Sequence, residues 1–164
     1  MGKPSRFHAV DDANRTRNEM FSLIKEQAPR FDTTFLCKSG AYSYVRQKGE
    51  MYLYKMAWYL RFKEIALQVS TVDDGPLRDR RFSIATSKRK AQAQAAIEDV
   101  SQQLQMHRAV HICHWNAPTS WGAQVADYGL WAVHRELLGK NCQWFPPCVK
   151  PTLSSVFLPW GQAK

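Results

Sequence analysis

One stretch near the end of the sequence, residues 124–135, constrains the fold more than any other. Ser120 stands before it where a helix N-cap would be, and Gly139 with Lys140 follows as a stop signal, so a helix is predicted between them. Apolar side chains recur along the stretch at helical spacing and predict a core-facing side. They are Val125, Ala126, Val133 and Leu137.

Asp127 interrupts this apolar pattern. Leu130 and Trp131 follow it by three and four residues and His134 by seven, so they share its side of the predicted helix. A carboxylate among large side chains is either hydrogen-bonded within the fold or functional. Two interpretations of Asp127 therefore stay open, a buried structural acid and an active-site acid. In both, we expect the side chain to be at least partly buried, and in the second to face a cleft at the strand ends.

Strand and helix patterns alternate along the rest of the chain. They predict strands at residues 7–10, 31–38, 81–86 and 109–113, and helices at residues 11–27, 47–67 and 87–106. This alternation favours an α/β domain with neighbouring parallel strands. The predicted inward side chains of the first and third helices are Met20, Phe21, Leu23, Ile24, Ala91, Ala95, Ile97, Val100 and Leu104. The tail after Gly139 is rich in aromatic residues and proline and is predicted to pack on the body as irregular structure.

The helix predicted at residues 47–67 is apolar nearly all round. A helix of that kind is expected to be buried on more than one side. Its aromatic side chains are interpreted as core, and the alternative is that they stack on bases.

The composition places limits on the kind of protein. A chain of 164 residues is long enough for one domain with a core, and its net charge of +9 favours an anionic partner such as nucleic acid. The alternative is a basic protein without such a partner. No apolar run approaches the roughly 18 residues of a membrane span. The four cysteines form no C-x-x-C pair and no signal peptide is recognised, which predicts reduced thiols in a cytoplasm.

Basic side chains cluster before and at the start of the helix predicted at residues 87–106. They are Arg78, Arg80, Arg81, Lys88, Arg89 and Lys90. Three of them occupy the first turn, where cations oppose the helix dipole, and a bound phosphate would relieve that conflict. We therefore predict phosphate contacts by Arg80, Arg81, Lys88, Arg89 and Lys90. The alternative is a solvated basic face that costs a few tenths of a kcal/mol.

Histidine and cysteine also gather at residues 107–114, as His107, His111, Cys113 and His114. On a strand His111 and Cys113 would share one face while His114 points to the other. Cys142 and Cys148 could add ligands, but no second pair has the spacing of a zinc site, so none is predicted.

Four segments together resemble a known family. Q-V-A-D-Y-G-L-W-A-V-H-R at residues 124–135 resembles the signature L-Q-x-A-D-Y-x-x-W-A-x-x-R, and R-F-H-A-V-D-D at residues 6–12 resembles F-H-A-T-E-D. S-K-R-K-A at residues 87–91 is similar to the basic start of that family's penultimate helix, and V-H-I-C-H-W at residues 110–115 to the strand before the signature. The family is a poorly characterised bacterial and phage one with an RNase H-like fold, a domain of unknown function whose full-length members open with D-E-S-G. The resemblance covers roughly residues 6 to 138.

The resemblance implies metal-dependent phosphodiester chemistry. RNase H-like enzymes hold two divalent metals with three or four converging carboxylates. Asp127 matches the signature's aspartate, and Asp11 and Asp12 fall at the family's Glu-Asp, so these three are the catalytic candidates, with Asp127 and Asp12 as ligands of Mg²⁺ or Mn²⁺. Helix capping is the alternative for Asp11 and Asp12.

The chain departs from the family's pattern at its other acidic positions. Cys37 with Lys38, and Ala85 with Thr86, stand where members often carry acids, and the D-E-S-G strand has no counterpart. We therefore expect an RNase H-like domain at residues 1–138 that lacks the first strands, followed by an extension at residues 139–164. The missing strands would leave an open sheet edge, which a second copy or a partner chain would cover.

The leading expectation for function is nucleic-acid binding by a degenerate or incomplete nuclease-like domain. Two alternatives remain, a metal-dependent nuclease completed by a second subunit and a protein-interaction module that uses the aromatic tail.

Overall fold

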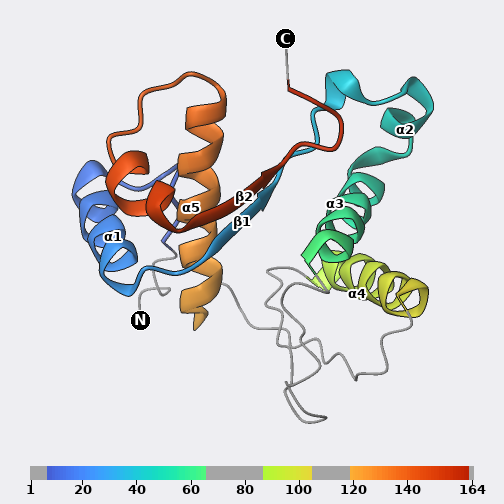
Figure 1. Cartoon of the computed structure of the whole chain (residues 1–164), viewed down its shortest axis with the longest axis horizontal. Coiled ribbons are helices and arrows are strands. Elements are labelled where there is room, and N and C mark those ends of the chain that lie inside the picture. The colour runs from blue at the N-terminus through green and yellow to red at the C-terminus, as the bar shows by residue number, and fades with distance from the viewer. Residues whose placement is uncertain (1–6, 66–86, 105–118, 163–164) are drawn as a thin grey trace, which may run out of the picture. The chain divides into compact units, whose positions relative to one another are not determined.

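The computed structural model describes residues 7–65, 87–104 and 119–162 (Figure 1). The described part is mixed α/β and mostly helical, with two parallel strands in one small sheet. The expected α/β class with parallel strands is confirmed, although β2 is not one of the strands that were predicted. The helices are α1 (Asn14–Gln27), α2 (Ser43–Gln47), α3 (Gly49–Ile65), α4 (Ser87–Gln103) and α5 (Trp121–Leu137), and the strands are β1 (Phe31–Thr34) and β2 (Leu153–Phe157).

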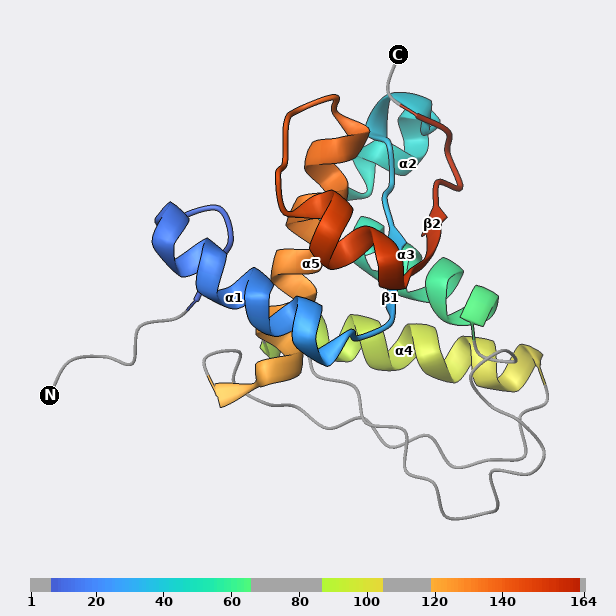
Figure 2. The same cartoon turned by 60° about the vertical axis from the view of Figure 1, so that its left-hand side comes forward.

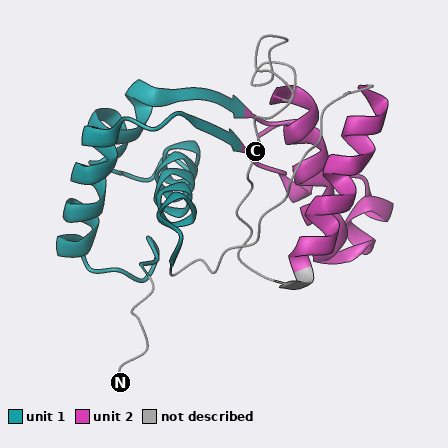
Figure 3. Ribbon diagram, turned by 90° about the horizontal axis from the view of Figure 1, so that it is seen from below, with its two compact units in different colours: residues 1–33, 115–156 teal, residues 34–114, 157–164 magenta. Residues whose placement is uncertain are grey.

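The chain divides into two compact units (Figure 3). The first comprises residues 1–33 and 115–156 and contains α1 and α5, and the second comprises residues 34–114 and 157–164 and contains α2, α3 and α4. The tail expected at residues 139–164 is shared between the two units. The predicted strands at residues 81–86 and 109–113 lie outside the described residues, as do Arg78, Arg80, Arg81 and the histidine–cysteine segment at 107–114.

The segment before α1 differs from its prediction. Residues 7–12 form no strand, because the His8 carbonyl accepts hydrogen bonds from the backbone N–H groups of Asp11 and Asp12 and closes a turn. Ala13 is the N-cap of α1 and no side chain caps it, so the predicted cap by Asp11 or Asp12 is wrong. Within α1 the predicted core positions are buried except Leu23, which is exposed.

Helix α5 has the ends that were predicted for it. The Ser120 side chain accepts the N–H of Ala123 at 3.3 Å, and Gly139 follows the C-cap with a φ of +64°. Its buried face is Gln124, Val125, Tyr128, Gly129, Ala132 and Val133. Ala126 and Leu137 were predicted inward and are exposed, because the buried face is centred on Tyr128 and Ala132.

The small sheet is built partly from the tail. β1 begins at the predicted residue but is shorter than expected, and β2 lies in the tail, so the prediction of a wholly irregular tail is wrong. Phe31 of β1 packs against α5 at Gly129, where an added Cβ would lie 2.1 Å from the Phe31 ring. Only glycine therefore fits at position 129 without a shift of the ring.

The second unit is organised around α3 and α4, which lie against each other in both views (Figures 1 and 2). Phe62, Ile97 and Val100 form a buried cluster, and Trp58, Tyr59 and Leu104 pack on it. This helix was expected to be buried on several sides. Only Leu53 and Phe62 of α3 are buried, and most of its other residues between positions 52 and 61 are half-buried, so the helix is only partly covered.

The start of α3 and two inward positions of α4 differ from their predictions. The helix predicted from residue 47 is divided at Gly49, whose φ of +82° separates α2 from α3. In α4 the buried residues include Ala93 and Ala96, whereas Ala91 is exposed and Ala95 half-buried, which corrects two inward positions.

No helix within residues 7–65, 87–104 and 119–162 combines the length and the apolar composition of a membrane span.

Candidate functional site

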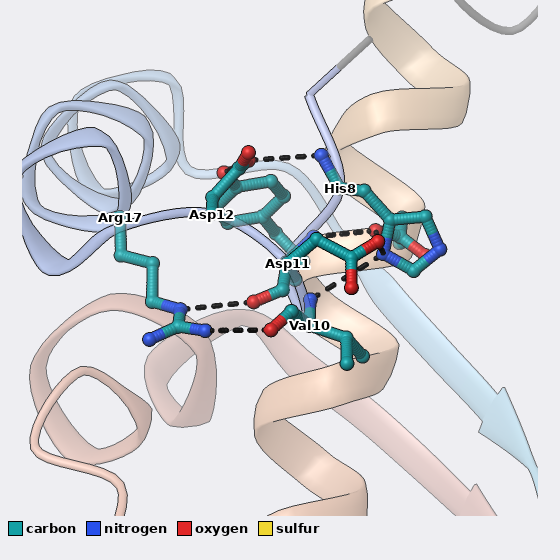
Figure 4. A network of polar contacts seen from close by, with 8 residues as sticks. His8, Val10, Asp11, Asp12 and Arg17 are labelled. Carbon is teal, nitrogen blue, oxygen red and sulfur yellow. Dashed lines mark hydrogen bonds and ion pairs between the residues drawn. The ribbon is translucent and has the colours of Figure 1, made fainter.

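The turn at residues 8–12 is bonded to α5 through Asp12 and Asp127, the two predicted metal ligands, and Figure 4 shows the turn with Asp12. Asp127 Oδ2 accepts the backbone N–H of Ala9 at 2.9 Å. Asp12 Oδ2 accepts the backbone N–H of His8 at 2.8 Å and also the hydroxyl of Tyr128. Two segments separated by 118 residues in sequence are therefore joined by carboxylate hydrogen bonds.

His8 lies between the acids. Its Nδ1 is 3.7 Å from Asp127 Oδ2 and 3.9 Å from Asp11 Oδ2. The backbone N–H of Val10 donates to the same nitrogen at 3.4 Å. The side chain of Asp11 is 79% exposed, whereas those of Asp127 and His8 are each 33% exposed. The structure thus brings Asp11, Asp12 and Asp127 to one place around a histidine.

Arg17 of α1 secures the same turn from the other side (Figure 4). Its Nε donates to the carbonyl of Ala9 and its Nη2 to that of Val10, both at 2.9 Å. The guanidinium also lies 4.9 Å from the centroid of the Trp131 ring, within the range of a cation–π contact. One side chain therefore satisfies two carbonyl groups of the turn and covers the tryptophan of the A-D-Y-x-x-W motif.

Tyr128 anchors the network in the core. It is fully buried, and its hydroxyl donates to Asp12. Burial, and then the hydrogen bond to the Asp12 carboxylate, hold the pKa of Tyr128 well above its ordinary value. The phenol therefore remains protonated and acts as a donor to the acid.

Asp127 is partly buried, as predicted, and it accepts the backbone N–H of Ala9. The described residues contain no group of three or more His, Cys, Asp or Glu side chains that could hold a metal ion. Asp12 and Asp127 each use Oδ2 to accept a backbone N–H group, so this oxygen of each acid holds the turn in place.

Three residues of the network were not identified from sequence. His8 and Tyr128 stand inside the motif segments, beside the acids, and that position was the available signal. Arg17 lies outside every motif, and its contacts with Ala9 and Trp131 are tertiary, so no local pattern marks it.

The predicted phosphate-binding turn lies in the second unit. α4 begins at Ser87, as predicted, and has no acid in its first turn. Arg89 and Lys90 are exposed on that turn, and the Arg89 guanidinium lies 5.2 Å from the centroid of the Tyr54 ring. Lys88 belongs to the same turn, while Arg80 and Arg81 precede the described part of this helix.

The aromatic tail is engaged within the first unit. Trp144 stacks on Phe21 of α1 with ring centroids 5.3 Å apart and planes 13° apart, and its Nε1 donates to Asn18 at 2.8 Å. Phe145 is buried. These two aromatic side chains are therefore committed to internal packing. The cysteines that the structure describes, Cys37, Cys142 and Cys148, are free thiols.

Compared with known proteins, the chain matches no family model, no curated protein and no solved structure. Its function is therefore inferred from its own residues.

Proposed function

We propose that this chain is a nucleic-acid-binding domain, similar to the RNase H-like family described above, in which the acidic residues hold the fold together instead of binding metal. The observation that carries the proposal is the basic first turn of α4. Arg89 and Lys90 are exposed there, and that turn contains no acid. A phosphate group would meet both the side chains and the positive end of the helix. The chain's net charge of +9 adds long-range attraction for the same kind of ligand.

The hydrogen bonds of the acids support the second half of the proposal. Asp12 and Asp127 occupy the motif positions of an RNase H-like acidic site, but each is an acceptor for backbone N–H groups of the turn at residues 8–12. The two motif segments also contact one another, which supports treating them as parts of one family pattern.

A nuclease completed by a second subunit is the second candidate. The observation in its favour is the gathering of Asp11, Asp12 and Asp127 around His8, with the Asp11 side chain open to solvent. A carboxylate from another chain would have to supply a further ligand there.

Incubation of the chain with labelled single-stranded and duplex DNA and RNA separates the candidates. Our proposal predicts binding that weakens steeply with salt, and no cleavage with Mg²⁺ or Mn²⁺. Cleavage that a chelator abolishes would favour the nuclease. If neither binding nor cleavage occurs at low salt, the proposal is wrong and the protein-interaction alternative gains support.

A further inference from the structure

Two exposed tyrosines precede α3 in the second unit. Tyr42 is 75% exposed and Tyr44 is 60% exposed, the two highest values among the large apolar or aromatic side chains that the structure describes. Their rings are 5.9 Å apart between centroids and only 13° from parallel. The two rings therefore stack on each other, and a further flat ring that packs on an outer face of this stack would add a favourable aromatic contact.

Three cations lie close to this pair in sequence. Arg46 and Lys48 follow Tyr42 and Tyr44 by four residues each, which places each cation one helical turn beyond a ring. Lys38 lies in the 3₁₀ turn just before the pair. All three are exposed, and none forms an ion pair with another described residue.

The aromatic and basic pattern continues into α3. The Lys48 ammonium lies 4.6 Å from the centroid of the Tyr52 ring, so this cation lies beside a further aromatic side chain. Residues 38–52, which include both exposed rings, contain three cations, Lys38, Arg46 and Lys48, and a single acid, Glu50. The surface around the exposed rings therefore attracts anions.

We propose that Tyr42 and Tyr44 form a stacking platform for unpaired bases, with Arg46 and Lys48 contacting the adjacent phosphates of a single-stranded nucleic acid. The faces of bases in a duplex are already stacked on neighbouring bases. An unpaired base, in contrast, has a π face that can stack on an aromatic side chain. Charge complementarity favours this occupant over a second basic copy of the chain, which would repel the same cations. The inference rests on the proposed function and adds strandedness and a second contact surface to it.

The test compares the affinity of the full chain for a labelled oligothymidine and for a duplex of equal length, by fluorescence anisotropy. Wild type should prefer the single strand. Tyr42→Ala with Tyr44→Ala should weaken single-strand binding about tenfold or more and leave duplex binding nearly unchanged. Tyr42→Phe with Tyr44→Phe keeps both rings and should bind like wild type. Leu130→Ala with Leu138→Ala removes two exposed apolar side chains from the first unit and should also have no effect.

Because the tyrosines are exposed, the double alanine variant should fold, and an unchanged melting temperature checks this. Two results would overturn the platform while the proposed function stands. The first is that the double alanine variant binds the single strand as tightly as wild type does, and the second is that wild type binds single strand and duplex with equal affinity. A complete lack of binding by wild type overturns both. A shift from dimer to monomer in the alanine variant, with its nucleic-acid affinity unaltered, would assign the surface to a second copy and would also overturn the platform.

Discussion

Arginine and aromatic side chains occur in both compact units, but they contact different things. In the first unit Arg17 donates to two backbone carbonyls and covers Trp131, and Tyr128 is buried against Asp12. In the second unit Tyr42 and Tyr44 are exposed, and Arg89 and Lys90 lie on an exposed helix turn.

The difference shows that residue type alone does not locate a binding surface. The motif acids of the first unit fall where family resemblance places chemistry, yet their oxygens accept hydrogen bonds that hold a turn to a helix. The cations and rings of the second unit belong to less specific patterns, yet solvent and ligands can reach them. We therefore expect substitutions in the first unit to change stability, and substitutions in the second unit to change binding.

The largest effect on stability should come from Gly129→Ala. The added Cβ would lie 2.1 Å from the Phe31 ring, so β1 or α5 must shift, and overpacking of this kind costs about 1–3 kcal/mol or more. Gly122→Ala on the same helix is the matched control, because nothing lies within 4 Å of its added Cβ. It should leave the protein as stable as wild type or slightly more stable. Urea unfolding of both variants measures the contrast, and equal stability would refute the close contact of β1 with α5.

The next largest effect should come from Asp127→Ala. It leaves the Ala9 N–H without its acceptor, at a cost of about 1–3 kcal/mol in the free energy of unfolding. Asp127→Asn keeps an acceptor oxygen and should cost less, and Asp11→Ala, at a side chain that is 79% exposed, should cost almost nothing. Nucleic-acid affinity should be unchanged in all three. A stable Asp127→Ala protein that loses affinity would instead assign Asp127 to the binding surface.

A smaller effect should appear with Tyr128→Phe at alkaline pH. The folded protein keeps the Tyr128 proton above the ordinary tyrosine pKa near 10, whereas the unfolded chain loses it, so the stability of wild type falls as pH rises past about 10. Phenylalanine lacks this proton. Near neutral pH the variant should be less stable by about 0.5–1.5 kcal/mol, because it cannot form the hydrogen bond to Asp12, and the gap should narrow above pH 10. Melting temperatures of wild type and Tyr128→Phe, measured from neutral pH to above pH 10, test this prediction. A difference in stability that stays constant with pH would show that the pKa of Tyr128 is not raised.

The sequence predicted the parts of the fold whose signals are local. Ser120 and Gly139 predicted the ends of α5, because caps and stop signals act within one turn of a helix. It did not predict the capping of α1, because the Asp12 side chain bonds to Tyr128, 116 residues away, instead of to the helix. β2 was missed because its five residues directly follow a proline-rich segment and pair with a strand far away in sequence.

For the candidate site, the sequence identified the acids but not their partners. A carboxylate on a mostly apolar helix predicted that Asp127 would be hydrogen-bonded or functional, and the structure supplies the hydrogen bond. The donor, the Ala9 N–H, is a backbone group of a distant turn, and every residue type except proline provides one. Such a partner leaves no trace in the composition or spacing of the sequence.

The central claim is that the start of α4 contacts phosphate, and the salt dependence of binding by a triple glutamine variant tests it most directly. Lys88→Gln, Arg89→Gln and Lys90→Gln together should weaken binding to every nucleic-acid sequence alike and reduce the slope of log affinity against log salt by about one unit for each phosphate that is no longer neutralised. Lys25→Gln, Lys140→Gln and Lys150→Gln remove the same charge from exposed positions of the first unit and should change the slope much less. An equal loss of affinity in both variants would show that net charge alone drives binding. Unchanged affinity of the α4 variant, with a raised melting temperature from relief of the helix dipole, would contradict the phosphate contact itself.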